Sequence, residues 1–241
     1  MSTDALKQLW KAAFGDDDGF IDLFFATAYT PERCRFLEAD GQLTAALYWF
    51  DCECNGAKYA YLYAVATDPA HRGKGLCRKL MAQTHAHLRS CGYAGVILVP
   101  GEPGLFDMYR KMGYRVMGGM DSITCPAGRN TAIRQASISE YAAARQTFLP
   151  EGGVTQEGEG LAFLAGYAAL YTGADFVLAA VREGQALLGL ELLGNADAAG
   201  GIVAALGCTE GRFRIPGKSP FAMYCPLSDS PAPKYFGLAF D

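Results

Sequence analysis

Apolar and polar residues alternate along the chain in a way that predicts both helices and strands. Apolar residues recur at helical spacing over 6–13 and again over 20–28, where Asp17 or Asp18 is expected to cap the second helix. Strict alternation then predicts strands, and the pairs Asp40-Gly41 and Asn55-Gly56 between them are hairpin signals. We therefore expect two helices followed by strands over 34–39, 43–54 and 58–67.

The pattern changes after residue 67. A loop with two glycines leads into a helix that begins near Leu76 and is closed by Gly92, and an apolar run over 95–100 predicts a buried strand. A short helix over 105–112 and short strands over 114–117 and 120–125 follow. The residues 126–130 are the best linker candidate, so we expect domains over 1–126 and 131–241.

The second half restarts the pattern. It predicts a strand over 131–137, a helix capped by Ser139, a helix over 159–171, strands over 175–181 and 185–193, a helix over 196–206 and three further strands. This order of elements echoes the first half without an exact repeat, which fits a worn structural duplication.

Composition narrows the class of protein. Of the 241 residues, 51% are hydrophobic and 19% are charged, which is typical of a chain with a packed core. The net charge is −4 and no basic run stands out, so nucleic acid is not an expected partner. No apolar stretch reaches about 18 residues, so no membrane is expected either. The polar start of the chain is not a secretory signal, which predicts a cytoplasmic protein with eight reduced cysteines and no metal site.

The glycine loop carries the candidate chemistry. A strand that feeds a glycine loop and then a helix binds anions, because the first-turn amides have no intrahelical partner and the helix dipole adds positive charge. Gly73 and Gly75 would let a phosphate approach the backbone, and Arg72 and Lys74 add charge. A dinucleotide motif Gly-x-Gly-x-x-Gly is excluded by Arg78, and a Walker motif is excluded because Gly73-Lys74 is followed by Gly75.

The segment Thr67–Cys77 resembles motif A of the GCN5-related N-acetyltransferases (GNAT), whose pattern is Gln/Arg-x-x-Gly-x-Gly/Ala. Arg72 and Gly75 match that pattern, and Cys77 stands where the family has glycine or alanine. The segment Met108–Tyr114 looks like the family's Tyr-x-x-x-Gly-Phe/Tyr sequence. The resemblance covers about residues 1–125. It implies an α/β (α+β) fold, with a mixed, mostly antiparallel sheet flanked by helices, followed here by a second, smaller α/β domain.

The resemblance also assigns roles to residues. It implies that acetyl-CoA is the co-substrate, that the strand edge at Val65, Ala66 and Thr67 pairs with its pantetheine arm, and that Tyr109 is the general acid that reprotonates the departing thiolate. A tyrosine suits this role because its ordinary pKa of about 10 keeps it protonated. The resemblance further implies that loop amides hold the pyrophosphate; these belong to Arg72, Gly73, Lys74, Gly75, Leu76 and Cys77.

The catalytic base is less defined by the sequence. The chain ends in an apolar, strand-like run over 235–241, and a tied-down end would hold the carboxylates of Asp241 in place. Some tandem-domain relatives, such as the protein N-myristoyltransferases, use a terminal carboxylate as the base, and this chain looks similar in having a second domain. The alternatives are an ordinary terminal strand and a water relay near Asp51, Glu53 or the tyrosines at 61 and 63.

Several functions remain open at this stage. We expect an N-acetyltransferase that acts on a primary amine of a small molecule, peptide or protein, and the alternative is a non-catalytic acyl-CoA-binding sensor or interaction module. The second half lacks a basic glycine loop, since Gly194-Asn195-Ala196-Asp197 has no cation, so one cofactor per chain is expected. The apolar strands of the second half need another sheet to pack against. The second half is therefore a candidate lid or homodimerisation domain. The acceptor is not identified.

Overall fold

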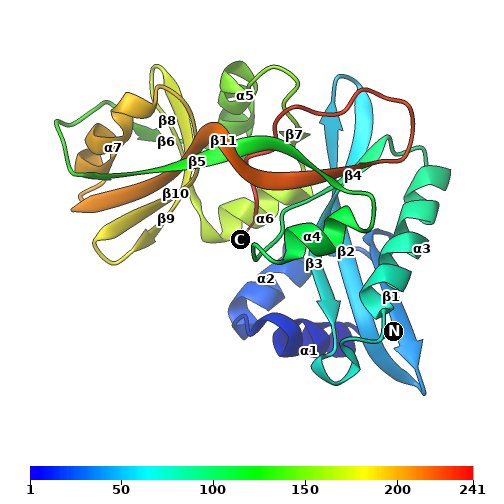
Figure 1. Cartoon of the computed structure of the whole chain (residues 1–241). Coiled ribbons are helices and arrows are strands. Elements are labelled where there is room, and N and C mark those ends of the chain that lie inside the picture. The colour runs from blue at the N-terminus through cyan, green and yellow to red at the C-terminus, as the bar shows by residue number, and fades with distance from the viewer. Residues whose placement is uncertain (241) are drawn as a thin grey trace. The chain divides into compact units, whose positions relative to one another are not determined.

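The computed structural model describes residues 1–240 and divides them into two compact units (Figure 1). Unit 1 consists of Met1–Arg115, Gly158–Phe163 and Met223–Ala232, and unit 2 of the remaining segments. The predicted division into 1–126 and 131–241 is contiguous along the sequence, whereas each compact unit draws on segments that are far apart in it.

Unit 1 contains the predicted order of two helices, three strands, a helix, a strand and a helix. Asp40 and Gly41 have φ values of 52° and 75°, and Asn55 and Gly56 have the same pair of values, so both hairpins have the turn that these residues predict. Asp17 caps the second helix. The elements are α1 (Thr3–Phe14), α2 (Asp18–Thr27), η1 (Pro31–Arg33), β1 (Cys34–Ala39), β2 (Gln42–Cys54), β3 (Ala57–Thr67), η2 (Pro69–His71), α3 (Leu76–Ser90), β4 (Gly95–Leu98) and α4 (Leu105–Arg110).

The sheet of unit 1 has a different helix layer on each face. Leu80, Met81 and Leu88 of α3 belong to one core cluster with Leu47 and Trp49 of β2. The alternate residues of β2 point the other way, where the ring of Tyr48 lies 5.5 Å from that of Trp10 and 5.1 Å from that of Phe24. Period-two alternation along β2 therefore packs α3 on one face and α1 and α2 on the other.

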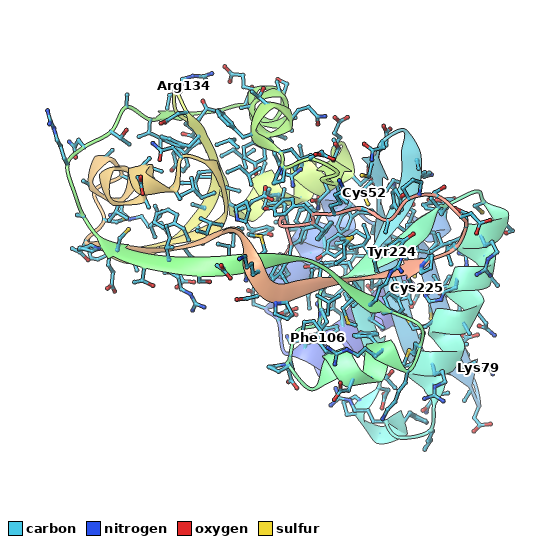
Figure 2. The ribbon with its side chains drawn as sticks, turned by 45° about the horizontal axis from the view of Figure 1, so that its top comes forward. Cys52, Lys79, Phe106, Arg134, Tyr224 and Cys225 are labelled. Carbon is cyan, nitrogen blue, oxygen red and sulfur yellow. The ribbon has the colours of Figure 1, made fainter. Side chains whose placement is uncertain are left out.

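The last strand of this sheet comes from near the end of the chain. Met223–Pro226, at the end of β11 (Glu210–Pro226), pair antiparallel with β4. Figure 2 labels two of these residues, Tyr224 and Cys225, on this part of the strand. Their ladder completes the order β1-β2-β3-β4-β11, in which β3 and β4 are parallel and the other neighbours antiparallel. The sheet is thus mixed and mostly antiparallel, as predicted.

Unit 2 repeats the topology of unit 1. Three successive antiparallel strands lead through a helix into a strand that is parallel to the third, since β10 pairs parallel with β11 from Ala186 to Gly189. The order and direction of these strands therefore match those of β1–β4 in unit 1. The remaining elements are β5 (Arg115–Pro126), β6 (Arg134–Gln135), α5 (Ile138–Phe148), β7 (Thr155–Gln156), α6 (Glu159–Tyr167), β8 (Ala169–Thr172), β9 (Phe176–Glu183), β10 (Ala186–Gly194), η3 (Ala196–Ala198) and α7 (Ala199–Ala205).

The sequence analysis divides two long strands into shorter ones, and both divisions are wrong. The glycines at these positions allow another segment to pack closely and do not end the strand. The strands predicted over 114–117 and 120–125 are one strand, β5, in which a side chain at Gly118 would collide with the backbone of Lys234 and one at Gly119 with that of Lys218. Likewise the three strands predicted after residue 206 are one, β11, where Gly217 lies against the side chain of Asp121. Glycine in a strand can mark close approach of another segment rather than a turn.

Other predicted elements of the second half are shorter or differently capped. The strand expected over 131–137 is reduced to β6, and Ser137 rather than Ser139 caps α5, because Ser137 and Glu140 form a reciprocal capping box. The segment 235–240 is not a strand but an irregular, buried run with one bridge between Gly153 and Tyr235.

Two further findings concern the chain as a whole. All eight cysteines lie within residues 1–240, and no disulfide joins them. Of the helices in this range, none is both long enough and apolar enough to cross a bilayer.

Candidate active site

A bulge in β3 opens the sheet of unit 1 between two parallel strands. Ala64 has a φ of 46°, and the register of β3 against β2 shifts at this point. Within residues 1–240, the ladder between β3 and β4 spans Tyr59–Tyr61, so Val65, Ala66 and Thr67 lie beyond it, while Ala66 and Thr67 still pair with β2. A bulge bends its strand and ends pairing locally. Val65–Thr67 therefore present a strand edge at the splayed end of the sheet.

The glycine loop follows this edge directly and opens α3. Gly73 and Gly75 both have φ of 76°, and Gly75 is the N-cap of α3 without a side-chain cap in the described part of the chain. A side chain at either glycine would meet no atom within 4 Å, so the loop is open on this side. The amides of the first turn, including those of Leu76 and Cys77, have no acceptor within the helix. The geometry fits a bound pyrophosphate.

The two cations of the loop have different surroundings. The Arg72 guanidinium donates hydrogen bonds to the carbonyl oxygens of Thr67 at 3.4 Å and Ala13 at 3.2 Å. It therefore anchors the loop to the end of α1 as well as adding charge. Asp68 accepts a hydrogen bond from the Ala70 amide and contacts His71, and these bonds hold the pKa of its carboxyl below the usual range. Lys74 is exposed at the tip of the loop.

Tyr109 is buried in the core beside the loop helix. Its side chain is 6% exposed, it belongs to the same cluster as Leu80 and Met81, and partly buried Cys77 packs against that cluster. Burial raises the pKa of the Tyr109 phenol above its ordinary value, with the nearby Cys77 thiol adding to the shift. The phenol is thus fully protonated at neutral pH and able to act as a proton donor.

The alternative base residues occupy less suitable surroundings. The Asp51 carboxylate accepts a hydrogen bond from the Tyr93 hydroxyl at 2.5 Å and pairs with Lys58 at 3.0 Å and, more loosely, with Arg33 at 3.7 Å. Two cations and a phenol reduce the availability of this carboxylate as a base. Glu53 is exposed on the same strand.

Asp241 lies outside the described residues, but the segment before it is firmly held within unit 2. The Val154 amide donates to the Tyr235 carbonyl at 2.9 Å, and the Gln156 side chain donates to the Leu238 carbonyl at 2.9 Å. The Tyr235 hydroxyl donates to Glu191, which forms a buried, two-bonded ion pair with Arg145 at 2.6 and 3.0 Å. The tied-down end predicted from the apolar run is confirmed for residues 235–240, although not as a strand.

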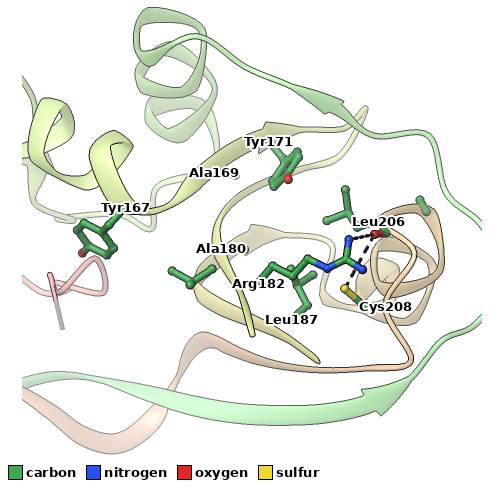
Figure 3. Close-up of a pocket in the computed structure, with 10 residues that line it drawn as sticks. Tyr167, Ala169, Tyr171, Ala180, Arg182, Leu187, Leu206 and Cys208 are labelled. Atoms are coloured by element: carbon green, nitrogen blue, oxygen red, sulfur yellow. Dashed lines mark hydrogen bonds between the residues drawn. The ribbon is translucent and has the colours of Figure 1, made fainter. Parts of the chain in front are cut away.

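Unit 2 has no counterpart of the phosphate loop in the described residues. After β10, Asn195 accepts the Asp197 amide, and Asp197 adds negative charge to the turn. A cavity of about 470 Å³ lies elsewhere in this unit, between α7 and strands β8–β10 (Figure 3). Its one cation, Arg182, donates to the carbonyls of Gly184, Leu206 and Gly207. An anion in this cavity would have to compete with these bonds for the Arg182 guanidinium.

Sequence reasoning missed several residues around this site. The side chain of His85 bonds to Tyr114, 29 residues away, and Arg33 pairs with Glu159 at 2.5 Å across 126 residues. Neither pair has a sequence signal, because both depend on tertiary packing. The bulge at Ala64 has a weak signal, since the tyrosine alternation of β3 stops at Tyr63 and small residues follow.

The fold and site together define a class: a mixed sheet whose parallel strands separate beside an open glycine loop at the start of a helix. Three solved structures share this fold over nearly the whole chain. They are a GCN5-related N-acetyltransferase from Anabaena variabilis (TM-score 0.72, 13% identity, 94% of this chain and 71% of that one), another from Kribbella flavida (0.67, 16%, 92% and 67%) and a tandem GNAT protein from the clavulanic acid biosynthesis pathway (0.57, 10%, 94% and 96%).

A comparison with family models makes the assignment specific. Residues 2–117 match the model of the acetyltransferase (GNAT) domain. This part of the chain is therefore a GNAT acetyltransferase domain, as its motifs predict, and the family implies acyl-CoA-dependent acetyl transfer. No curated protein matches the sequence significantly.

Proposed function

We propose that this protein is an acetyl-CoA-dependent N-acetyltransferase that acts on a primary amine of a small molecule, peptide or protein. One observation carries the proposal: the strand edge Val65–Thr67 runs directly into a loop whose two glycines have φ of 76° and leave the start of α3 open. A strand edge and a row of free amides in sequence suit an extended arm that ends in a pyrophosphate.

The residues around this opening have different roles in binding and catalysis. Backbone groups of Val65–Thr67 orient the pantetheine arm, and amides from Arg72 to Cys77 hold the pyrophosphate. The amine nitrogen attacks the thioester carbonyl carbon directly, and the carbon–sulfur bond breaks. Tyr109 donates its phenolic proton to the departing sulfur, and a base takes the proton that the nitrogen loses. The amine must be neutral to attack, so this base is essential to the scheme.

Asp241 is the proposed base. The support is the segment that precedes it: residues 235–240 are buried, and Tyr235 and Leu238 are held by hydrogen bonds to Glu191 and Gln156. To test this, Asp241 is deleted in one variant, and a short Gly-Ser tail is appended in another. We expect turnover to fall in both while acetyl-CoA affinity stays the same. Full activity in both variants would move the role to a water relay.

The overall proposal is tested by measuring thiol release from acetyl-CoA over a broad panel of amines, with calorimetry of acetyl-CoA binding alone. We expect binding at one site per chain and amine-dependent thiol release. Binding without turnover on any amine would instead support the second candidate, an acyl-CoA-binding sensor. Absence of binding would contradict both.

A further inference from the structure

A half-buried histidine, His85, is linked to the proposed acid through Tyr114 and is not used in the scheme above. His85 lies on α3, and its Nε2 atom is 2.7 Å from the hydroxyl oxygen of Tyr114. Tyr114 is 3% exposed, and its ring centroid is 5.5 Å from that of His85. Polar groups in a core are costly when unpaired, so each of these two side chains fixes the position of the other.

Tyr114 is in turn attached to Tyr109 in two ways. Gly113, with a φ of 91°, ends the turn after α4 and returns the chain so that the Tyr114 amide donates to the Tyr109 carbonyl at 3.1 Å. The two rings then meet edge to face, with centroids 5.6 Å apart and planes at 61°. The orientation of the Tyr109 ring therefore depends on that of Tyr114, which depends on the bond to His85.

His85 and Tyr114 are both uncharged at neutral pH, as a stable hydrogen bond between them requires. Burial, with a contribution from Arg89, lowers the pKa of His85 to about 4, and burial raises the pKa of Tyr114. Both groups are neutral at neutral pH, so the hydrogen bond between them persists over the working range without a change of charge. A phenylalanine at 114 would fill the same space but would rotate about its ring axis without this directional bond.

We propose that His85 and Tyr114 are positioning residues that hold the phenol of Tyr109 at the angle from which it donates its proton. The inference rests on the proposed function, because it assumes that Tyr109 is the acid. It assigns no direct contact with the substrate to either residue. Since a misplacement of about 1 Å can cost about 10²-fold in rate, loss of one hydrogen bond in this support should cost about tenfold.

The test is a double-mutant cycle with acetyl-CoA and the best amine of the panel. Tyr114→Phe and His85→Leu should each lower kcat about tenfold while the Kd for acetyl-CoA stays unchanged, and His85→Gln, which keeps a hydrogen-bonding group, should recover most of the loss. In a Tyr109→Phe background, Tyr114→Phe should have no further effect, because the proton donor is already absent. An equal loss in both backgrounds would overturn the inference.

A readout without turnover separates this inference from the proposed function. Isotope-labelled tyrosine rings are followed by NMR in the wild type and in the two His85 variants, each checked for cooperative melting. His85→Leu should average the Tyr109 ring signals through faster flipping, and His85→Gln should leave them close to wild type. Unchanged Tyr109 signals in His85→Leu would refute the positioning role even if no amine were acetylated. An absence of thiol release with altered ring signals would refute the proposed function alone.

Discussion

At the scale of single residues, burial controls the chemistry of the site. Tyr109 is among the core residues and has a raised pKa, so it stays protonated until a strongly basic centre forms beside it. A departing thiolate is strongly basic only while it is shielded from water. The buried phenol of Tyr109 lies in surroundings that exclude water as well. The same burial that stabilises the domain thus sets the protonation state of the proposed acid.

We expect Tyr109→Phe to lower turnover by about 10²–10⁴-fold, the usual contribution of a general acid, while acetyl-CoA affinity stays nearly the same. The reason is that only a proton donor is lost and the ring still fills its place in the core. Steady-state kinetics with calorimetry measure both quantities. Tyr59→Phe is the matched control, since its hydroxyl bonds to the Pro231 carbonyl instead. A loss below about threefold in Tyr109→Phe would make Tyr109 a structural residue.

His85 also makes the fold sensitive to acid. Its pKa is lowered from 6.5 to about 4, so between these pH values the unfolded chain holds a proton that the folded chain does not. The free energy of unfolding therefore falls as the pH drops from about 6.5 to about 4, by about 3 kcal/mol for the full shift, and this contribution is intact above that window.

Urea unfolding across this window should show a flatter pH dependence in His85→Gln than in the wild type. His87→Gln is the control, because the pKa of His87 is also lowered but its imidazole is half-buried beside Arg35 and makes no contact with Tyr114 among the described hydrogen bonds. A pH dependence in His85→Gln as steep as that of the wild type would contradict the assignment to His85.

Sequence reasoning succeeded for residues whose role is local. Asp40-Gly41 and Asn55-Gly56 predict their hairpins because positive φ is a property of the residue itself, and Gly73 and Gly75 predict the loop for the same reason. It failed for His85 with Tyr114 and for Arg145 with Glu191, which are 29 and 46 residues apart. Their contacts exist only after α4 and β10 have packed, so no local pattern records them.

At the scale of elements, the strand–loop–helix of unit 1 differs from its repeat in unit 2 by its turn. Both β3 and β10 have an irregular register, and in both the parallel ladder ends beside it. The first turn opens into glycines and cations, whereas the second is capped by Asn195 and carries Asp197. The same strand–loop–helix topology thus carries an open loop with two cations in unit 1 and a turn without a cation in unit 2.

The glycine at the start of α3 gives a sharp test at this scale. Gly75→Val should weaken acetyl-CoA binding at least tenfold, because a left-handed backbone costs a branched residue about 1–2 kcal/mol and the side chain intrudes on the phosphate. Gly92→Val is the matched control: it lies beyond the other end of α3, has a φ of 80° and is equally open. Calorimetry and melting temperature should show equal destabilisation but lost binding in Gly75→Val alone. Equal affinity in both variants would contradict the loop assignment.

At the scale of the whole molecule, the two units share one strand. Met223–Pro226 pair with β4, the Leu227 amide donates to the Ala94 carbonyl at 2.9 Å, and Arg89 donates to the Leu227 carbonyl at 3.2 Å. No local sequence pattern predicts this pairing, because β4 and Met223–Pro226 are more than 100 residues apart and meet only through tertiary packing. The GNAT domain recognised over 2–117 therefore lacks, in sequence, one strand of its own sheet.

A fragment of residues 1–126 should not melt cooperatively, because β4 would lose its ladder with Met223–Pro226 and leave an apolar edge exposed. Circular dichroism on heating measures this. Joining residues 222–232 to the fragment through a flexible linker should restore a cooperative transition, at a lower temperature than the full chain because Phe163 and its aromatic contacts are still missing. A cooperative transition of the bare fragment at the temperature of the full chain would contradict the role of the shared strand.

The shared strand also bears on how the protein is made. A ribosome synthesises the amino-terminal half first, at about 5–20 residues per second, so about 6–26 s pass between the end of β4 and the end of its partner strand at Pro226. During this interval the nascent chain exposes the apolar edge of a nearly finished sheet, which is a typical target for chaperones. Premature termination between residues 115 and 222 would release a chain whose acetyltransferase motifs are complete but whose sheet lacks the strand Met223–Pro226. The sheet that carries the proposed site can therefore form only after residue 226 has been synthesised.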